Sequence, residues 1–263
     1  MSQNNHHNSR KFKIHFSKKS ISVIALGLVI IATGIFDLSY KEKQKNPVVI
    51  AEVAPIRMVP SGEIEHGDMS KKQVIFTFDA GAGLQSAKKI LEVLARHHVK
   101  GTFFMTGKFV EANPDFVRKV VTAGHEIFNH TYDHPHLPTL TDAEIVTELD
   151  KVNASLASVV GSTSMISTRP FFRAPYGDRD ERVMNVALKN GYHGVYWTVD
   201  AHDWEESTGV TPAEVVGRII SNLKSGNIYL MHVGDNITGD VLDQVFTEIE
   251  AKGYKIVSLT QGI

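Results

Sequence analysis

Two histidines four residues apart, His130 and His134, are the first residues of this chain whose types and spacing indicate chemistry. They follow a short β-like run, Glu126-Ile127-Phe128, and a helical turn after that run would bring both imidazoles to one point. Neutral imidazole is the most common protein ligand for zinc, and it also binds cobalt, iron or nickel. The pair therefore predicts a site for a divalent metal ion without selecting the ion.

Composition narrows the classes of protein and of metal site. The chain of 263 residues is 42% hydrophobic and 22% charged, which predicts one sizeable globular domain with an appendage. A formal net charge of -1 gives no general attraction to nucleic acid, so no nucleic-acid partner is expected. We expect the protein to be a monomer. The absence of cysteine excludes disulfides and thiolate ligands. Any metal must therefore be held by histidine, carboxylate or water.

The amino-terminal segment predicts a membrane anchor. Residues 1–20 are polar and basic, and residues 21–36 carry no charge. A basic flank before an apolar run favours a cytoplasmic amino terminus. We expect residues 1–20 to be a cytoplasmic tail, residues 21–40 to be a single transmembrane signal anchor, and the globular domain to lie outside the cell membrane. The alternative is secretion after cleavage near the small residues at 32–34.

The rest of the chain reads as a linker followed by one α/β domain. Residues 41–71 combine charge with turn-forming residues and lack periodicity, which predicts a linker. Beyond them, β-rich runs alternate with helical segments up to residue 263. The predicted strands are residues 74–78, 102–105, 126–128, 171–172, 194–199, 228–231 and 255–259. The predicted helices are residues 86–97, 113–123, 142–160, 180–189, 212–223 and 239–251. Such alternation predicts parallel strands over residues 72–263.

Polar residues follow the carboxyl ends of five of these runs: Asp79, His130, Arg173, Asp203 and His232. Each alone has an ordinary structural explanation, such as a helix cap or a surface ion pair. Together they suit amide hydrolysis, and a common site requires the strand ends to converge. In an open sheet the first and last strands would lie far apart, whereas a barrel mouth gathers them. We therefore favour a distorted (β/α) barrel with about seven parallel strands.

Five segments resemble the motifs of a known family: residues 77–81, 130–134, 173–177, 200–204 and 230–232. Over about residues 73–260, and in the same order, they resemble the polysaccharide deacetylase family, the NodB-homology domain of carbohydrate esterase family 4. The resemblance implies a hydrolase acting on non-peptide carbon–nitrogen bonds, which removes acetyl groups from N-acetylated sugars with one divalent ion. Zinc is the first expectation, with cobalt or another divalent ion as alternatives.

The resemblance implies an acid and a base. Asp79 would be the general base and His232 the general acid, while Arg173 would pair with Asp79 and Asp203 would orient His232. These roles agree with the chemistry, because amide hydrolysis needs an activated water, a stabilised oxyanion and a proton for the departing amine. A carboxylate paired with arginine and a histidine kept cationic by a carboxylate supply the two proton transfers.

The resemblance also implies the groups that would bind the ion and the substrate. His130 and His134 would be the metal ligands. The backbone N–H of Tyr176 would bind the oxyanion, and Trp204 and Leu230 would form walls of the acetyl pocket.

One position departs from the family pattern. The family's first motif has two consecutive aspartates, the second of which is a metal ligand, and Ala80 stands in its place here. A methyl group does not coordinate metal. We expect an ion held by two imidazoles and waters, or the recruitment of Asp133 or Asp200, and weaker binding in either case.

Three functions follow from these observations. The first is a membrane-anchored, metal-dependent deacetylase of cell-envelope glycan, such as peptidoglycan or chitin-like oligomers. The second is a catalytically weakened or inactive glycan-binding envelope protein, because of Ala80. The third is a hydrolase of another acetylated or amide substrate on the same scaffold.

Overall fold

The computed structural model describes residues 63–161 and 167–263. The expected cytoplasmic tail, membrane anchor and most of the linker therefore lie outside the described residues. Within the described ranges, no helix is both long enough and apolar enough to cross a membrane.

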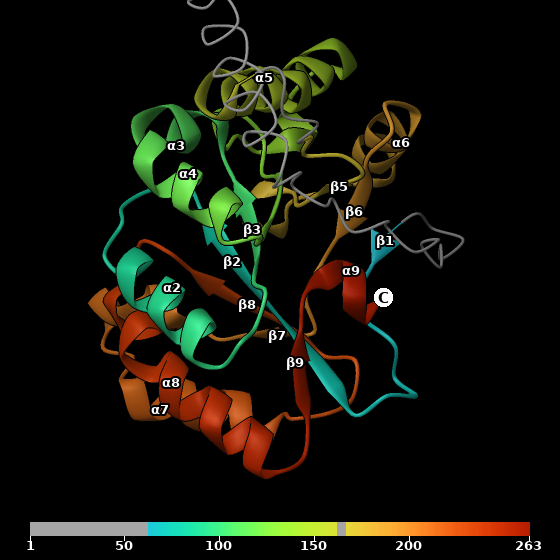
Figure 1. Ribbon diagram of the computed structural model, residues 1–263. Helices are drawn as coiled ribbons and strands as arrows, with labels where there is room; N and C mark the ends of the chain where they lie inside the picture. The colour runs from blue at the N-terminus through green and yellow to red at the C-terminus, as the bar shows by residue number, and fades with distance from the viewer. Residues whose placement is uncertain (1–62, 162–166) are drawn as a thin grey trace, which may run out of the picture. The chain divides into compact units, whose positions relative to one another are not determined.

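A single sheet forms the centre of the described chain, and all its strand pairs are parallel (Figure 1). Its strands are β1 (Glu63–Ile64), β2 (Gln73–Ala80), β3 (Thr102–Met105), β4 (Glu126–Asn129), β5 (Phe171–Phe172), β6 (His193–Val195), β7 (Val199–Asp200), β8 (Ile228–His232) and β9 (Lys255–Val257). Their order is β1-β6-β5-β4-β3-β2-β8-β7, with β9 paired to β2. The expected strand at 194–199 is divided into β6 and β7, and β1 lies inside the range expected to be linker.

The sheet is the distorted (β/α) barrel that the sequence predicts, but it is incomplete, and it has nine strands among the described residues where about seven were expected. Strands β6 and β7 stand near opposite ends of the sheet order, yet only residues 196–198 separate them in the chain. Within this short segment, Tyr196 donates its N–H to the carbonyl of Ile64 in β1 at 2.8 Å, and Thr198 donates to Ile228 in β8 at 2.9 Å. The segment therefore bridges the two sides of the ring where no β1–β7 ladder forms among the described residues.

Amphipathic helices cover the sheet. They are α2 (Ala87–Arg96), α3 (Gly107–Ala112), α4 (Pro114–Thr122), α5 (Asp142–Val160), α6 (Glu181–Lys189), α7 (Pro212–Ser221), α8 (Asn236–Ala251) and α9 (Leu259–Gly262). Figure 1 shows α2, α7 and α8 gathered on the β8 side and α3, α4 and α5 on the β3 side. Capping boxes begin α5 at Thr141 and α7 at Thr211, because each threonine and the glutamate three residues later satisfy each other's backbone N–H.

Successive side chains of strand β2 point to opposite faces of the sheet. Phe76, Phe78 and Ala80 pack in the hydrophobic cluster beneath the helices. Thr77 and Asp79 take the opposite face, where both accept hydrogen bonds from Arg173. The alternation therefore directs Asp79 into the barrel mouth and leaves the Ala80 methyl group in the outer core.

Candidate active site

A cavity of about 630 Å³ opens where the strands end. All the predicted site residues line it except Arg173 and Asp203, which are buried behind it. The complete lining is Asp79, Gly81, Ala82, His130, His134, Ala174, Tyr176, Gly177, Trp197, Asp200, Trp204, Leu230, His232, Gly234 and Asp235. Its volume is within the range of small-molecule sites in enzymes. The strand ends therefore gather the predicted residues into one site.

His130 and His134 converge as a pair of metal ligands would. The Nδ1 atom of His130 lies 2.9 Å from the carbonyl oxygen of Arg173 and donates its proton to that oxygen. The Nε2 atom of the neutral ring therefore has a free lone pair. The Nε2 atoms of the two rings are 3.2 Å apart. Two nitrogens each about 2.1 Å from one tetrahedral ion would be separated by about 3.4 Å. The two imidazoles therefore fit a shared divalent ion.

Electrostatics keeps both rings in the neutral form that binds metal. Burial lowers the pKa of His130, which is almost fully shielded from solvent. Burial is the main cause that lowers the pKa of His134, to about 4. Both imidazoles are therefore uncharged at neutral pH and need lose no proton to coordinate an ion.

Asp79 is a buried carboxylate held by Arg173. The Nη1 atom of Arg173 donates to Oδ1 of Asp79 at 2.7 Å, while Oδ2 lies 3.4 Å from Nε2 of His130. Burial opposes ionisation of Asp79, but the charge and the hydrogen bond of Arg173 outweigh it and hold the pKa of Asp79 below its ordinary value. One oxygen is thus occupied by arginine, and the other faces the histidine pair as an ionised acceptor.

Arg173 itself is held on every side. Its Nε donates to the carbonyl of Val195 at 3.1 Å and its Nη2 to that of Tyr196 at 3.2 Å. The guanidinium also lies 4.2 Å from the ring centre of Phe104. A cation with four hydrogen bonds orients Asp79 with little freedom to move.

His232 is held by Asp203. Its Nδ1 lies 2.9 Å from Oδ1 of Asp203, and its backbone N–H donates to Oδ2 of Asp203 at 2.7 Å. Thr238 donates its hydroxyl to the same Oδ2. Burial opposes the charged ring, but the hydrogen bond and the charge of Asp203 outweigh it and raise the pKa of His232 to about 9. His232 therefore carries a proton at neutral pH, with Nδ1 committed to Asp203.

Two carboxylates, Asp133 and Asp200, were expected as substitute ligands. The expectation for Asp133 is wrong. Its side chain is 53% exposed, forms an ion pair with Lys108 and does not line the cavity. Asp200 does line the cavity, and its Oδ1 accepts the backbone N–H of His202 at 2.8 Å. In the described part of the chain, no third carboxylate or histidine is grouped with both His130 and His134 at ligand distance.

One other group has metal-ligand geometry among the described residues: Asp203, His232 and Asp235. Two of its members are already hydrogen-bonded to each other, because Asp203 accepts from Nδ1 and from the backbone N–H of His232. The geometry of these two is that of a carboxylate orienting a proton donor. The His130–His134 pair, by contrast, offers two imidazole nitrogens that face each other at 3.2 Å.

The predicted substrate-binding residues lie at the rim and wall of the cavity. Tyr176 has a φ of 59°, and its backbone N–H has no hydrogen bond among the described residues, so it is available to an incoming oxyanion. The Trp204 side chain is 48% exposed at the rim, and Leu230 is buried in the wall. Sequence reasoning missed Trp197 and Asp235, which also line the cavity. Trp197 lies in the bridging segment and Asp235 just after β8, so position after a strand was the available signal.

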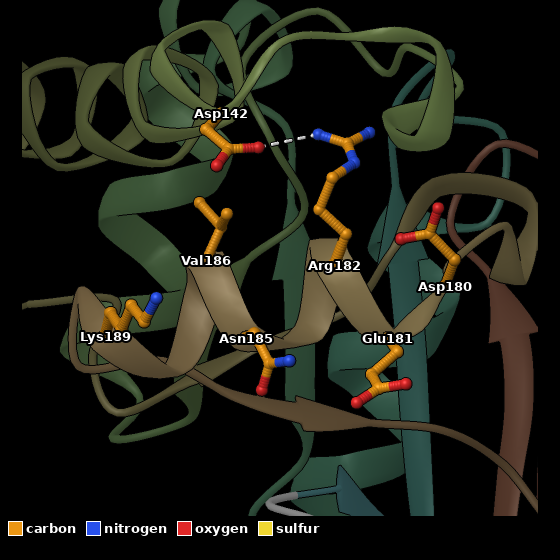
Figure 2. A pocket seen from close by; sticks show the side chains of 7 residues that line it. All are labelled: Asp142, Asp180, Glu181, Arg182, Asn185, Val186 and Lys189. Carbon is orange, nitrogen blue, oxygen red and sulfur yellow. Dashed lines mark hydrogen bonds and ion pairs between the residues drawn. The ribbon is translucent and has the colours of Figure 1, made fainter.

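A second hollow of about 530 Å³ lies on α6, away from this site (Figure 2). Figure 2 shows Arg182 of α6 extending toward Asp142 at the start of α5. The two side chains form an ion pair with a nitrogen-to-oxygen distance of 2.8 Å. None of the predicted site residues lines this hollow. Its charged side chains are those of a solvated helix face.

Comparison with known proteins places the chain among deacetylases. The family model described as polysaccharide deacetylase matches residues 66–195. The chain is 33% identical over 193 residues to the peptidoglycan N-acetylmuramic acid deacetylase of Bacillus subtilis, covering 73% of this chain and 72% of that protein. It is 32% identical over 197 residues to a peptidoglycan N-acetylglucosamine deacetylase of Bacillus cereus, covering 73% and 69%.

A solved structure adds a contrasting relative. A pseudoenzyme of carbohydrate esterase family 4 from Bacillus anthracis has a TM-score of 0.70 and 30% identity, covering 77% of this chain and 69% of that one. A mutant of that pseudoenzyme with restored enzymatic activity has a TM-score of 0.71 and 32% identity, covering 77% and 71%. The same fold is therefore found in both active and inactive relatives.

Proposed function

The chain belongs to the polysaccharide deacetylase family, which includes hydrolases of carbon–nitrogen bonds, and we propose that it removes acetyl groups from peptidoglycan amino sugars. The carrying observation is the convergence of four side chains on one cavity: an ionised Asp79, a protonated His232, and the paired Nε2 atoms of His130 and His134. These are the base, the acid and the metal ligands that hydrolysis of an acetamide needs.

The described residues divide the chemistry among them. His130 and His134 would hold a divalent ion, which would supply Lewis acidity for the acetamide carbonyl and would lower the pKa of the attacking water. Asp79 accepts a proton from the attacking water through Oδ2, since Oδ1 is occupied by Arg173. The Tyr176 N–H donates to the oxyanion. His232 then delivers its Nε2 proton to the departing sugar amine, because its Nδ1 is committed to Asp203.

The substrate assignment rests on the relatives and on the cavity. Relatives that are about one-third identical act on N-acetylglucosamine or N-acetylmuramic acid in peptidoglycan. Exposed Trp204 and Tyr176 at the rim offer aromatic faces to a sugar chain. We assign a cell-wall glycan as the substrate class and zinc as the ion, with cobalt able to replace it.

We also propose that the amino-terminal segment anchors the protein in the cell membrane, with the catalytic domain outside. Support comes from the basic residues before an uncharged run at 21–36. Cleavage and secretion is the alternative, and either arrangement puts the domain beside its glycan.

Ala80 favours a second candidate function, a glycan-binding protein with weakened or absent catalysis. Its methyl group is buried in the outer core and does not line the cavity, and no third ligand is assembled around the histidine pair within the described ranges. A pseudoenzyme among the similar structures shows that this fold tolerates loss of activity. The retained Asp79, Arg173, Asp203 and His232 support the catalytic function, because a binding module needs neither an acid nor a base.

Acetate release distinguishes these functions. The full-length chain is incubated with N-acetylglucosamine oligomers and with peptidoglycan, with chelator or with added zinc or cobalt. We expect zinc-dependent acetate release from at least one glycan. Binding of the glycan without acetate release in any metal condition would favour the second candidate, and neither binding nor release would point to another amide substrate. Mass spectrometry of the digested peptidoglycan then identifies which of the two sugars has lost its acetyl group.

A further inference from the structure

The segment Thr131–His134, which we call the histidine loop, has an unusual backbone. Thr131 has a φ of 64° and His134 a φ of 61°, both in the left-handed region that non-glycine residues seldom adopt. Such a conformation persists only where the surroundings enforce it. Since this loop carries His134 back toward His130, the contacts that enforce it also place the second metal ligand.

Glu148 of α5 holds the centre of the histidine loop. A single carboxylate oxygen, Oε2, accepts the backbone N–H of Tyr132 at 3.0 Å and that of Asp133 at 2.8 Å. Two consecutive N–H groups aimed at one anion form a compact backbone binding site. Glu148 is half-buried and stands far from the loop in sequence, so tertiary structure rather than local sequence supplies this acceptor.

Other contacts hold different parts of the loop. Asn129 accepts the N–H of Thr131 through its side-chain oxygen at 2.8 Å, and the first residues of α3, Gly107 and Lys108, donate to the carbonyls of Thr131 and Tyr132 at 3.0 and 3.1 Å. A Cβ at Gly107 would meet the Tyr132 ring at 2.2 Å, so the loop packs directly on that backbone. For the N–H groups of Tyr132 and Asp133, Glu148 is the acceptor.

The two histidines depend on the loop to different degrees. His130 is oriented by its own Nδ1 hydrogen bond to the carbonyl of Arg173. For His134, the hydrogen bonds among the described residues include none from Nδ1, and its ring contacts are with His130 and Tyr176. The position of His134 therefore follows the backbone conformation of the histidine loop.

We propose that Glu148 is a positioning residue that fixes the histidine loop so that His134 meets His130 at one metal ion. Ala80 stands where the family has a third protein ligand, so, among the described residues, only two histidines define this site. The position of His134, and hence the role of Glu148, therefore matters more here than in a site with three protein ligands. The inference rests on the proposed function to the extent that these histidines bind the ion.

Calorimetric titration of the metal-free, full-length chain with zinc tests the proposal. Glu148→Ala should weaken zinc binding by about tenfold or more, the effect expected when a ligand loses its supporting contact. Glu148→Gln should bind nearly as well as wild type, since its amide oxygen can accept the same two N–H groups. Glu148→Asp keeps the charge but shortens the side chain, so it should bind zinc as poorly as Glu148→Ala. Wild-type affinity in both shortened variants would overturn the proposal.

Glu144 on the same helix provides a matched control. Its carboxylate also accepts two hydrogen bonds, from the N–H and hydroxyl of Thr141, but it caps α5 rather than the histidine loop. Glu144→Ala should therefore lower the melting temperature without changing zinc affinity. An equal loss of zinc affinity in Glu144→Ala would show that general destabilisation of α5 explains the effect, and would also overturn the proposal.

Amide hydrogen exchange of the metal-free protein separates this inference from the proposed function. The Tyr132 and Asp133 amides should exchange faster in Glu148→Ala than in wild type or Glu144→Ala, as measured by NMR. If wild type binds no zinc, the proposed metal dependence fails, and these exchange rates alone decide whether Glu148 holds the loop. Unchanged exchange of both amides in Glu148→Ala would contradict that role.

Discussion

Asp79 and His232 are register partners at the ends of the adjacent parallel strands β2 and β8. Neighbouring strands lie about 4.8 Å apart, so the two side chains leave adjacent backbones and line the same cavity. Their environments are opposite in effect: Arg173 keeps Asp79 ionised, and Asp203 keeps His232 protonated. The pair is therefore set for one proton acceptance and one proton donation within the same cavity.

Removing either member of this pair should stop turnover without unfolding the domain. Asp79→Asn and His232→Ala should each lower acetate release by roughly 10²-fold or more, because proton transfer contributes about 10² to 10⁴. Circular dichroism checks the fold, and Asp240→Asn, a surface carboxylate paired with Lys89, serves as the control. Unchanged turnover in either variant would remove that residue from the mechanism.

The raised pKa of His232 predicts a pH dependence of stability. A folded-state pKa of about 9 against an ordinary value of 6.5 means that protonated His232 stabilises the fold fully below pH 6.5, and that this stabilisation is lost as pH rises through 9. The maximum effect is on the order of 3 kcal/mol. Urea denaturation in the presence of chelator should show the free energy of unfolding of wild type falling toward that of His232→Asn over this interval. Parallel curves for the two proteins would contradict the shift.

How far the sequence predicted the fold depends on the length of each element. Helix α5 was expected with the bounds that the structure has, because it is long and begins with a capping box. Strand β1 and helix α3 were missed, since two residues show no alternation and a six-residue helix that begins with glycine gives little periodic signal. The expected last strand ends at Val257, because Ser258 caps α9.

The site residues were predicted from their types and from their positions after strands. The reason why they lie close together is partly different from the one expected. The barrel was inferred because the first and last strands seemed too distant to share a site. The structure instead places β2 inside the sheet beside β8, so Asp79 and His232 would be neighbours even without closure. Side-chain direction could not be predicted for Asp133, whose pairing with Lys108 of α3 depends on tertiary packing. The Glu148 contact was hidden for the same reason.

The location of the domain can be tested on intact cells. If the first 45 residues anchor the protein with its domain outside, protease added to cells stripped of their wall should degrade the domain. A cytoplasmic protein marker should survive the same treatment. Protection of the domain until the membrane is lysed would contradict the proposed topology.

Restoring a carboxylate at Ala80 tests the missing ligand. Ala80 is fully buried, so Ala80→Asp should destabilise the metal-free protein, because the new carboxylate has no partner there. Zinc should reverse this loss if the carboxylate reaches the ion, with affinity raised about tenfold or more. Calorimetry and thermal unfolding with and without zinc measure both effects. Equal zinc affinity in wild type and Ala80→Asp would mean that the new carboxylate does not join the site or that another group already fills the third position.

Zinc-dependent acetate release from N-acetylglucosamine oligomers and peptidoglycan, compared between the full-length wild type and His130→Ala, tests the central claim most directly. His130 carries one of the two converging Nε2 atoms, yet it is neither the proposed base nor the proposed acid. We predict that wild type releases acetate when zinc is supplied, that chelator stops the release, and that His130→Ala releases little in either condition. Release by His130→Ala equal to that of wild type, or wild-type release that is unaffected by chelator, would contradict a metal-dependent deacetylase built on this histidine pair.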